Sequence, residues 1–183
     1  MTNKKMIFPG SKTPELKVNS IKINNWSLSS AKPQNFTLII IYRGLHCPIC
    51  CDYLKEFDDK IEKFNNLGTD LIAISTDDES RAIKSYKNWG LENINIGFNL
   101  KPEKAIEWGL FLSKGIANPS LTISEPKIFV EPGLFLVDPD MKLYLSNIQS
   151  MPFTRPPVSQ LLTGIKFAID KDYPARGSLK YLK

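Results

Sequence analysis

The chain has 183 residues, of which 42% are hydrophobic and 23% are charged, a balance typical of a folded protein with a hydrophobic core. This composition excludes an intrinsically disordered chain, and the prolines and glycines show no period that would indicate a repeat protein. The net charge of +5 forms no continuous basic run and accompanies no nucleic-acid-binding motif, so we expect no nucleic-acid partner. The longest apolar stretch, Leu38–Tyr42, is too short to span a bilayer, so we expect no membrane segment.

The first half of the chain predicts alternating strands and helices. After a loop-rich stretch at residues 9–33, the apolar, β-branched segment Phe36–Tyr42 predicts a central strand that is buried on both faces. A helix is expected from Cys47 to the glycine at position 68, because apolar residues recur there at helical spacing. Asp70–Ser75 predicts a second buried strand, and the polar residues Thr76–Glu79 then favour the start of another helix.

The second half predicts a strand, a helix, a hairpin and a final helix. These elements are expected at Ile94–Phe98, Pro102–Trp108, Gly133–Val137 with its antiparallel partner Met141–Leu145, and Pro157–Asp170. Residues 109–125 show no clear period and receive no assignment. Together these elements predict an α/β fold with a mixed central sheet flanked by helices. We expect one domain over residues 1–183, with its core at about 9–170 and a tail at about 171–183.

The three cysteines, Cys47, Cys50 and Cys51, lie within five consecutive residues. Such close spacing closes no long loop, so it does not fit a secreted domain stabilised by disulfides. Residues 1–9 contain two lysines but no apolar segment typical of a signal peptide. Both observations predict a cytoplasmic protein.

Cys47 and Cys50 form a C-x-x-C unit where the central strand is expected to run into a helix. Unpaired N–H groups and the partial positive charge at a helix start favour a thiolate, which is the reactive form of cysteine. Pro48 fits the first turn, where a missing N–H costs nothing. Cys50 follows one turn later, close enough to attack a mixed disulfide on Cys47. The spacing therefore predicts that Cys47 is the attacking thiol and Cys50 the resolving thiol.

Metal binding and inert thiols are the alternatives to this redox interpretation. A zinc or iron–sulfur site needs four ligands, and three cysteines with the single histidine, His46, lie too close in sequence to surround one metal ion. We therefore expect no metal. Three buried, unreactive cysteines would be the other alternative. For Cys51, a packing role is favoured over that of a reserve resolving thiol.

Three basic residues are candidates for stabilising the thiolate. Two lie next to the cysteines in the sequence, and the third lies far from them. A protonated His46 would do so by its charge, whereas the alternative is a partly exposed turn residue without a defined role. Arg43 precedes the cysteines in the same turn. Arg155 lies far away in sequence, so only the fold could bring it to the site.

The segment Leu38–Cys50, with its Tyr-Arg-Gly-x-x-Cys-Pro-x-Cys pattern, resembles the thioredoxin superfamily. More narrowly, it is similar to the peroxiredoxin-like branch of the AhpC/TSA family, and Pro132–Asp140 resembles a late strand and turn of those proteins. The resemblance implies a thioredoxin-like fold and an antioxidant thiol oxidoreductase that reduces hydroperoxides or disulfides. It implies no bound cofactor and a thioredoxin- or glutathione-type reductant, and it leaves a homodimer open.

Two positions depart from the peroxiredoxin pattern. Gly44 stands where those proteins typically have a threonine, and Pro132 where they have an arginine, so two donors that would orient a peroxide are missing. Thioredoxins have a cis-proline at the position of Pro132, so the resemblance predicts a cis Glu131–Pro132 bond, with an ordinary trans proline as the alternative. The choice between peroxide and disulfide stays open. A non-enzymatic redox sensor and a degenerate binding module with inert thiols are hypotheses from other classes.

Overall fold

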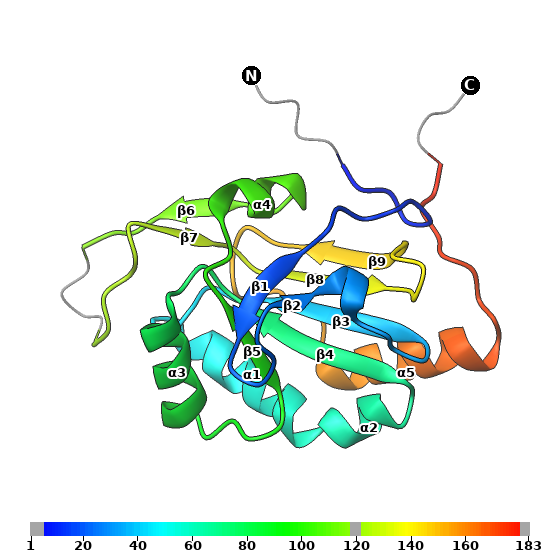
Figure 1. The fold of residues 1–183 in the computed structure, drawn as a ribbon, viewed down its shortest axis with the longest axis horizontal. Helices are drawn as coiled ribbons and strands as arrows, with labels where there is room; N and C mark the ends of the chain where they lie inside the picture. The colour runs from blue at the N-terminus through cyan, green and yellow to red at the C-terminus, as the bar shows by residue number, and fades with distance from the viewer. Residues whose placement is uncertain (1–5, 118–121, 180–183) are drawn as a thin grey trace.

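The computed structural model describes residues 6–117 and 122–179. Within these residues, seven strands form one mixed sheet in the order β2-β1-β5-β4-β3-β8-β9, with helices on both faces (Figure 1). The strands of this sheet are β1 Lys17–Ser20, β2 Trp26–Ser27, β3 Phe36–Ile41, β4 Thr69–Ile74, β5 Asn95–Phe98, β8 Gly133–Val137 and β9 Leu143–Ile148. The helices are the 3-10 helix η1 Leu28–Ser30, α1 Pro48–Asp59, α2 Ile61–Asn65, α3 Glu79–Asn88, α4 Pro102–Glu107 and α5 Val158–Asp170. The predicted α/β fold with a mixed central sheet is confirmed.

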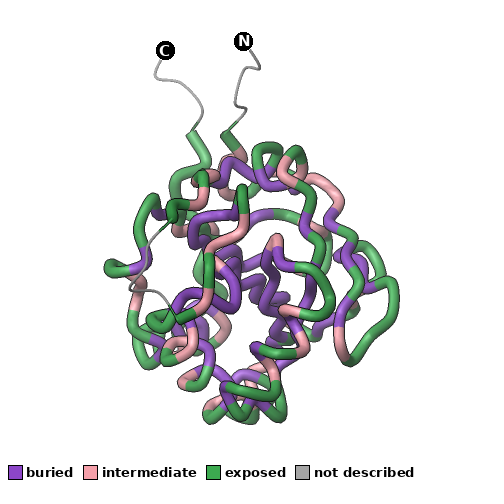
Figure 2. The backbone as a smooth tube through the Cα atoms, turned by 90° about the vertical axis from the view of Figure 1, so that its left-hand side faces the viewer, coloured by how far each residue is buried: buried purple, intermediate pink, exposed green. Residues whose placement is uncertain are grey.

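Strand β3 lies in the middle of the sheet because its side chains are apolar on both faces. All six of its residues are buried, and it pairs parallel with β4 and antiparallel with β8. One face of the sheet is covered by α1, α2, α3 and α5, which lie together in Figure 1. The other face is covered by η1, α4 and the chain around them. Figure 2 shows the resulting buried interior inside an exposed outer surface.

The helix expected from Cys47 to residue 68 is divided into α1 and α2. The break falls at Lys60, where the backbone leaves helical geometry. Just before it, the buried Asp58 carboxylate accepts backbone N–H groups of Glu92, Asn93 and Ile94 at 2.7–3.1 Å. These bonds hold the end of α1 against the start of β5, while both helices bury the same apolar stripe. The stripe therefore looked continuous in the sequence although the helix is not.

A small second sheet has one strand within the unassigned residues 109–125 and the other just after them. Strands β6, Leu112–Lys114, and β7, Ile128–Val130, pair antiparallel next to α4 (Figure 1). Three residues per strand give too short a pattern to stand out in a sequence. None of the helices in the described ranges combines the length and apolar content needed to cross a membrane.

Candidate functional site

The dithiol lies directly after the carboxyl end of β3. Cys47 is the N-cap residue of α1, Pro48 is the first helical residue, and Cys50 lies one turn further on. The Cα atoms of the two cysteines are 5.3 Å apart, and their Sγ atoms lie at disulfide distance. Only 2% of Cys47 and 0% of Cys50 is exposed. The arrangement thus combines a helix N-terminus with two sulfur atoms that are largely shielded from bulk solvent.

Arg155 reaches the dithiol from the segment between β9 and α5. Its Nη2 lies 3.0 Å from the Cys50 Sγ, and its Nη1 donates to the carbonyl oxygen of Ile49 at 3.4 Å. The guanidinium carbon lies 5.0 Å from the centre of the Tyr53 ring, and the Tyr53 hydroxyl donates to the carbonyl oxygen of Pro156 at 2.7 Å. Burial lowers the pKa of Arg155 to about 10, so the group remains charged at neutral pH. A cation therefore contacts Cys50 rather than Cys47.

Arg43 is engaged by carboxylates. Its Nε lies 3.3 Å from Glu131 Oε2 and its Nη2 lies 3.5 Å from Glu125 Oε1. Its guanidinium also stacks over the Phe129 ring at 4.7 Å, and the Ser113 hydroxyl donates to Glu131 Oε1 at 2.5 Å. Because both ends of the guanidinium face carboxylates, its charge is largely neutralised within this network.

His46 is buried and neutral at pH 7. Its Nε2 lies 4.0 Å from Glu125 Oε1, and its ring packs edge-on against Phe129. Burial, followed by the charge of Arg43, lowers the pKa of His46 to about 4. The hypothesis that a protonated His46 favours the thiolate at neutral pH is therefore wrong, because the imidazole is desolvated beside a guanidinium. The alternative of a partly exposed residue is wrong as well.

The turn before Cys47 is held by Asp77, a residue that sequence reasoning did not place in the site. The fully buried Asp77 carboxylate accepts the Leu45 N–H and the Arg81 Nε–H, each at 2.7 Å. It lies so close to Gly44 that a Cβ there would come within 2.6–2.8 Å of its atoms, and the φ of Gly44 is +122°. The signal in the sequence was the position of Asp77, just after a buried strand that runs parallel to β3.

Pro132 follows β7 and immediately precedes β8, but its peptide bond is trans. No peptide bond in the described ranges is cis, so the predicted cis Glu131–Pro132 bond is wrong. The backbone is paired on both sides of the bond. The Glu131 N–H donates to the carbonyl oxygen of Phe111 at 2.9 Å, and the Pro132 carbonyl oxygen accepts from the backbone N–H of Gln149 at 3.0 Å. These bonds fit an extended passage from one strand into the next.

Cys51 is half-buried and free, and it packs against the hydrophobic core. Burial is the main cause that raises the pKa of its thiol. A thiol with a raised pKa is a poor nucleophile at neutral pH. In the part of the chain that the structure describes, no group of three or more His, Cys, Asp or Glu side chains is arranged to hold a metal ion.

The fold and the motif were compared with known proteins. Residues 9–146 match the model of the AhpC/TSA family. No curated protein matches the chain. Solved structures with the same fold include a cysteine-to-serine mutant of peroxiredoxin 6 from Arenicola marina, with 18% identity and a TM-score of 0.71 over 91% of this chain and 76% of that chain. The mitochondrial 2-Cys peroxiredoxin from Plasmodium falciparum has 19% identity and a TM-score of 0.70, over 96% and 100% of the two chains. A peroxiredoxin-like protein from Aquifex aeolicus has 17% identity and a TM-score of 0.69, over 88% of each chain.

Proposed function

The chain belongs to the AhpC/TSA family and is a thiol-dependent oxidoreductase, and we propose that it reduces hydroperoxides with the Cys47–Cys50 dithiol. One observation carries the proposal: the two sulfur atoms lie within bonding reach at the start of α1 while both residues are almost fully buried. A small hydroperoxide needs less space at a shielded sulfur than a folded protein does. A folded protein disulfide, like a protein reductant, reaches these sulfur atoms only when the dithiol turn opens, so the buried arrangement favours the smaller oxidant.

The reaction proceeds in two sulfur-centred steps. The Cys47 thiolate attacks one peroxide oxygen, the O–O bond breaks, and the departing alkoxide or hydroxide takes up a proton and leaves as alcohol or water. Cys47 is thereby oxidised to a sulfenic acid. The Cys50 thiolate then attacks the Cys47 sulfur, hydroxide leaves and is protonated to water, and the disulfide forms. Two electrons and two protons from external thiols restore the dithiol, and the reaction uses no further cofactor.

The two thiols are activated by different groups in this mechanism. Cys47 lies at the N-terminus of α1, where backbone N–H groups and the helix dipole favour its thiolate. Cys50 is in contact with the Arg155 guanidinium, which favours a thiolate ready to resolve the sulfenic acid. Arg155 is thus the positioning and activating residue for the second step rather than the first.

The surface beside the dithiol supports a protein thiol as the reductant. A shallow groove of about 310 Å³ borders Arg155 and carries the exposed apolar side chains of Ile49 and Phe153 together with the carboxylates of Asp52 and Glu56. Glutathione is anionic and would meet both these carboxylates and the Arg155 cation, so the charge of the groove does not favour its binding over that of a protein. A thioredoxin-type partner can cover the apolar side chains. We further propose that this thiol–disulfide exchange takes place in the cytoplasm.

Steady-state turnover tests the proposal. The protein is supplied with either thioredoxin and its reductase or glutathione and its reductase, and it is assayed with hydrogen peroxide and, separately, with insulin as a protein disulfide. We expect peroxide-dependent turnover with the thioredoxin system. Turnover of insulin without turnover of peroxide would instead establish disulfide exchange, the second candidate that the C-x-x-C spacing supports.

Two variants assign the two steps. In Cys50→Ser, peroxide should leave a stable sulfenic acid on Cys47, which dimedone labels and mass spectrometry locates. In Cys47→Ser, no sulfenic acid should form at a comparable rate. Labelling of Cys50 in the second variant would reverse the assigned roles.

A further inference from the structure

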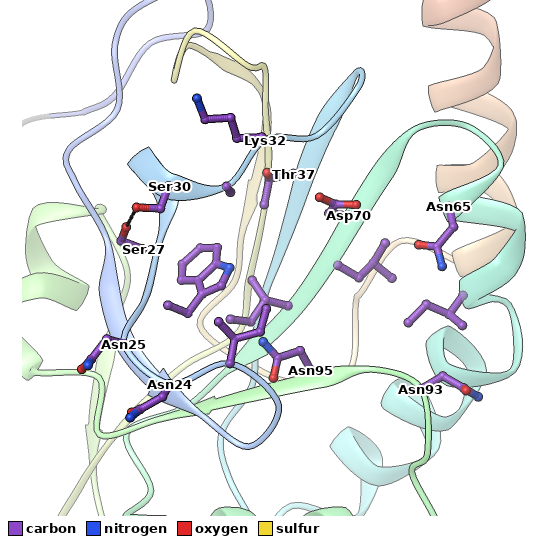
Figure 3. Close-up of a pocket in the computed structure, with 16 residues that line it drawn as sticks. Asn24, Asn25, Ser27, Ser30, Lys32, Thr37, Asn65, Asp70, Asn93 and Asn95 are labelled. Atoms are coloured by element: carbon purple, nitrogen blue, oxygen red, sulfur yellow. Dashed lines mark hydrogen bonds between the residues drawn. The ribbon is translucent and has the colours of Figure 1, made fainter.

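A cavity of about 630 Å³ lies at the opposite end of the sheet from the dithiol (Figure 3). It is bounded by the β1–β2 connection, η1, α2 and the amino ends of β3 and β4, whereas the dithiol follows the carboxyl end of β3. This volume falls within the range of about 300–1,000 Å³ that is usual for small-molecule sites.

Thr37 and Asp70 lie side by side in this cavity, on neighbouring strands and in register (Figure 3). Further along the same face, the paired positions are apolar, as in Ile39 with Ile72. The paired side chains on this face of β3 and β4 therefore change from buried and apolar to polar where the cavity begins. Thr37 is only 2% exposed, and its hydroxyl has no hydrogen-bond partner among residues 6–117 and 122–179. The hydroxyl oxygen is not one of the fully enclosed unpaired polar atoms, so it faces the cavity and is available to a ligand or to water there.

Asp70 supplies a carboxylate that is likewise unpaired within the described ranges. Partial desolvation raises the pKa of Asp70 although the residue is exposed, because no described cation or N–H donor opposes that effect. Lys32 also borders the cavity, but its ammonium group points away from Asp70 in Figure 3. The cavity therefore offers a strong acceptor at Asp70 without an intramolecular partner.

Amides and one aromatic ring complete the lining. Asn24 and Asn65 line the cavity, and their side chains form no hydrogen bonds to other described residues, whereas Asn95 is engaged by Ser20 and Lys22. Trp26 contributes an indole that is 8% exposed. Free amides present both donors and acceptors, and an indole presents a flat apolar face.

We propose that this cavity binds a neutral polyhydroxylated small molecule, such as a monosaccharide or a polyol. A hydroxyl group donates to the Asp70 carboxylate and accepts from an asparagine amide, so it matches both kinds of polar group in the cavity. The C–H groups of a sugar ring can contact the small exposed part of the Trp26 indole. An ammonium ligand has no acceptor for the amide N–H groups, and a phosphate would be repelled by Asp70.

Ligand-observed NMR on the full chain tests this site with glucose, N-acetylglucosamine and sorbitol as probes. We expect at least one probe to give saturable binding below ~10 mM, the weak end of the affinities that such a polar cavity supports. Thr37→Val and Asp70→Asn should each weaken that binding about tenfold, because each removes a hydrogen-bonding or charged partner of the ligand. Spermidine and inorganic phosphate serve as cationic and anionic probes.

Control variants distinguish a loss of ligand binding from a loss of folding. Thr163→Val makes the same change on α5, outside the cavity, and should leave binding unchanged. Thermal melting of Thr37→Val establishes that this nearly isosteric variant is folded. The proposal is overturned if none of the three polyols saturates, if only spermidine or phosphate binds, or if folded Thr37→Val and Asp70→Asn bind as the unsubstituted chain does.

Discussion

Arg43 and Arg155 both lie beside the dithiol turn, yet their surroundings differ. Arg43 faces the carboxylates of Glu125 and Glu131, whereas Arg155 forms no ion pair with a carboxylate in the described part of the chain and instead contacts the Cys50 sulfur. Closeness to a cysteine therefore does not decide which cation activates a thiol. The partners that already contact the guanidinium matter more, and on this basis we propose a structural role for Arg43 and a chemical role for Arg155.

Replacing Arg43 should have the largest effect, and that effect should be on stability. Arg43→Met leaves Glu131, which is nearly fully buried, without its cation, and breaking such a buried pair costs about 3–5 kcal/mol. Urea unfolding would measure this loss. Glu131→Gln in the same background should recover part of it, and an unchanged free energy of unfolding in Arg43→Met would contradict the structural role.

The pH dependence of stability should report the burial of His46. Its pKa is about 4 in the folded chain and about 6.5 when unfolded, so the unfolded state binds more protons between these values. The free energy of unfolding should therefore fall as the pH drops from about 6.5 to 4, by up to about 3 kcal/mol. His46→Gln should remove most of this slope. A slope retained in the variant would assign it to other groups.

Replacing Arg155 should change thiol chemistry with little change in stability. In a Cys47→Ser, Cys51→Ser background, Arg155→Met should move the pH midpoint of Cys50 alkylation upward by about one unit, because an adjacent cation favours the thiolate. In the dithiol protein, the resolving step at pH 7 should slow about tenfold. Arg43→Met is the matched control. An equal shift in both variants would remove the distinction between the two arginines.

The smallest effect is expected for Cys51. Because its thiol is half-buried and its pKa is raised, Cys51→Ser should change peroxide turnover by less than about twofold. Mass spectrometry after oxidation should still find the Cys47–Cys50 disulfide. A Cys47–Cys51 disulfide in the unsubstituted protein would establish the reserve resolving role.

Local patterns were sufficient for the central strands and for the dithiol. Strands β3 and β4 were predictable because their apolar, β-branched residues fit a sheet that is buried on both faces. The placement of Cys47 and Cys50 was predictable because a strand, a turn and a helix start follow one another in sequence.

The charge state of the site was not predictable, because it depends on residues far apart in sequence. His46 is neutral owing to burial under Phe129 and the nearby Arg43, and Arg43 is engaged by two glutamates about 80–90 positions further on. The approach of Arg155 to Cys50 likewise depends on the packing of α5 and on the Tyr53 hydrogen bond to the neighbouring segment. The local sequence pattern around the cysteines does not indicate these contacts between distant residues.

The contact between Gly44 and Asp77 constrains how this site can evolve. A threonine at position 44 would collide with the Asp77 carboxylate and would have to adopt a backbone conformation that suits glycine. A carboxylate at 77 and a side chain at 44 are therefore alternative solutions for holding the same turn. Across relatives of this chain, the two positions should change together, and a mutational path from one solution to the other must pass through the loss of the carboxylate first.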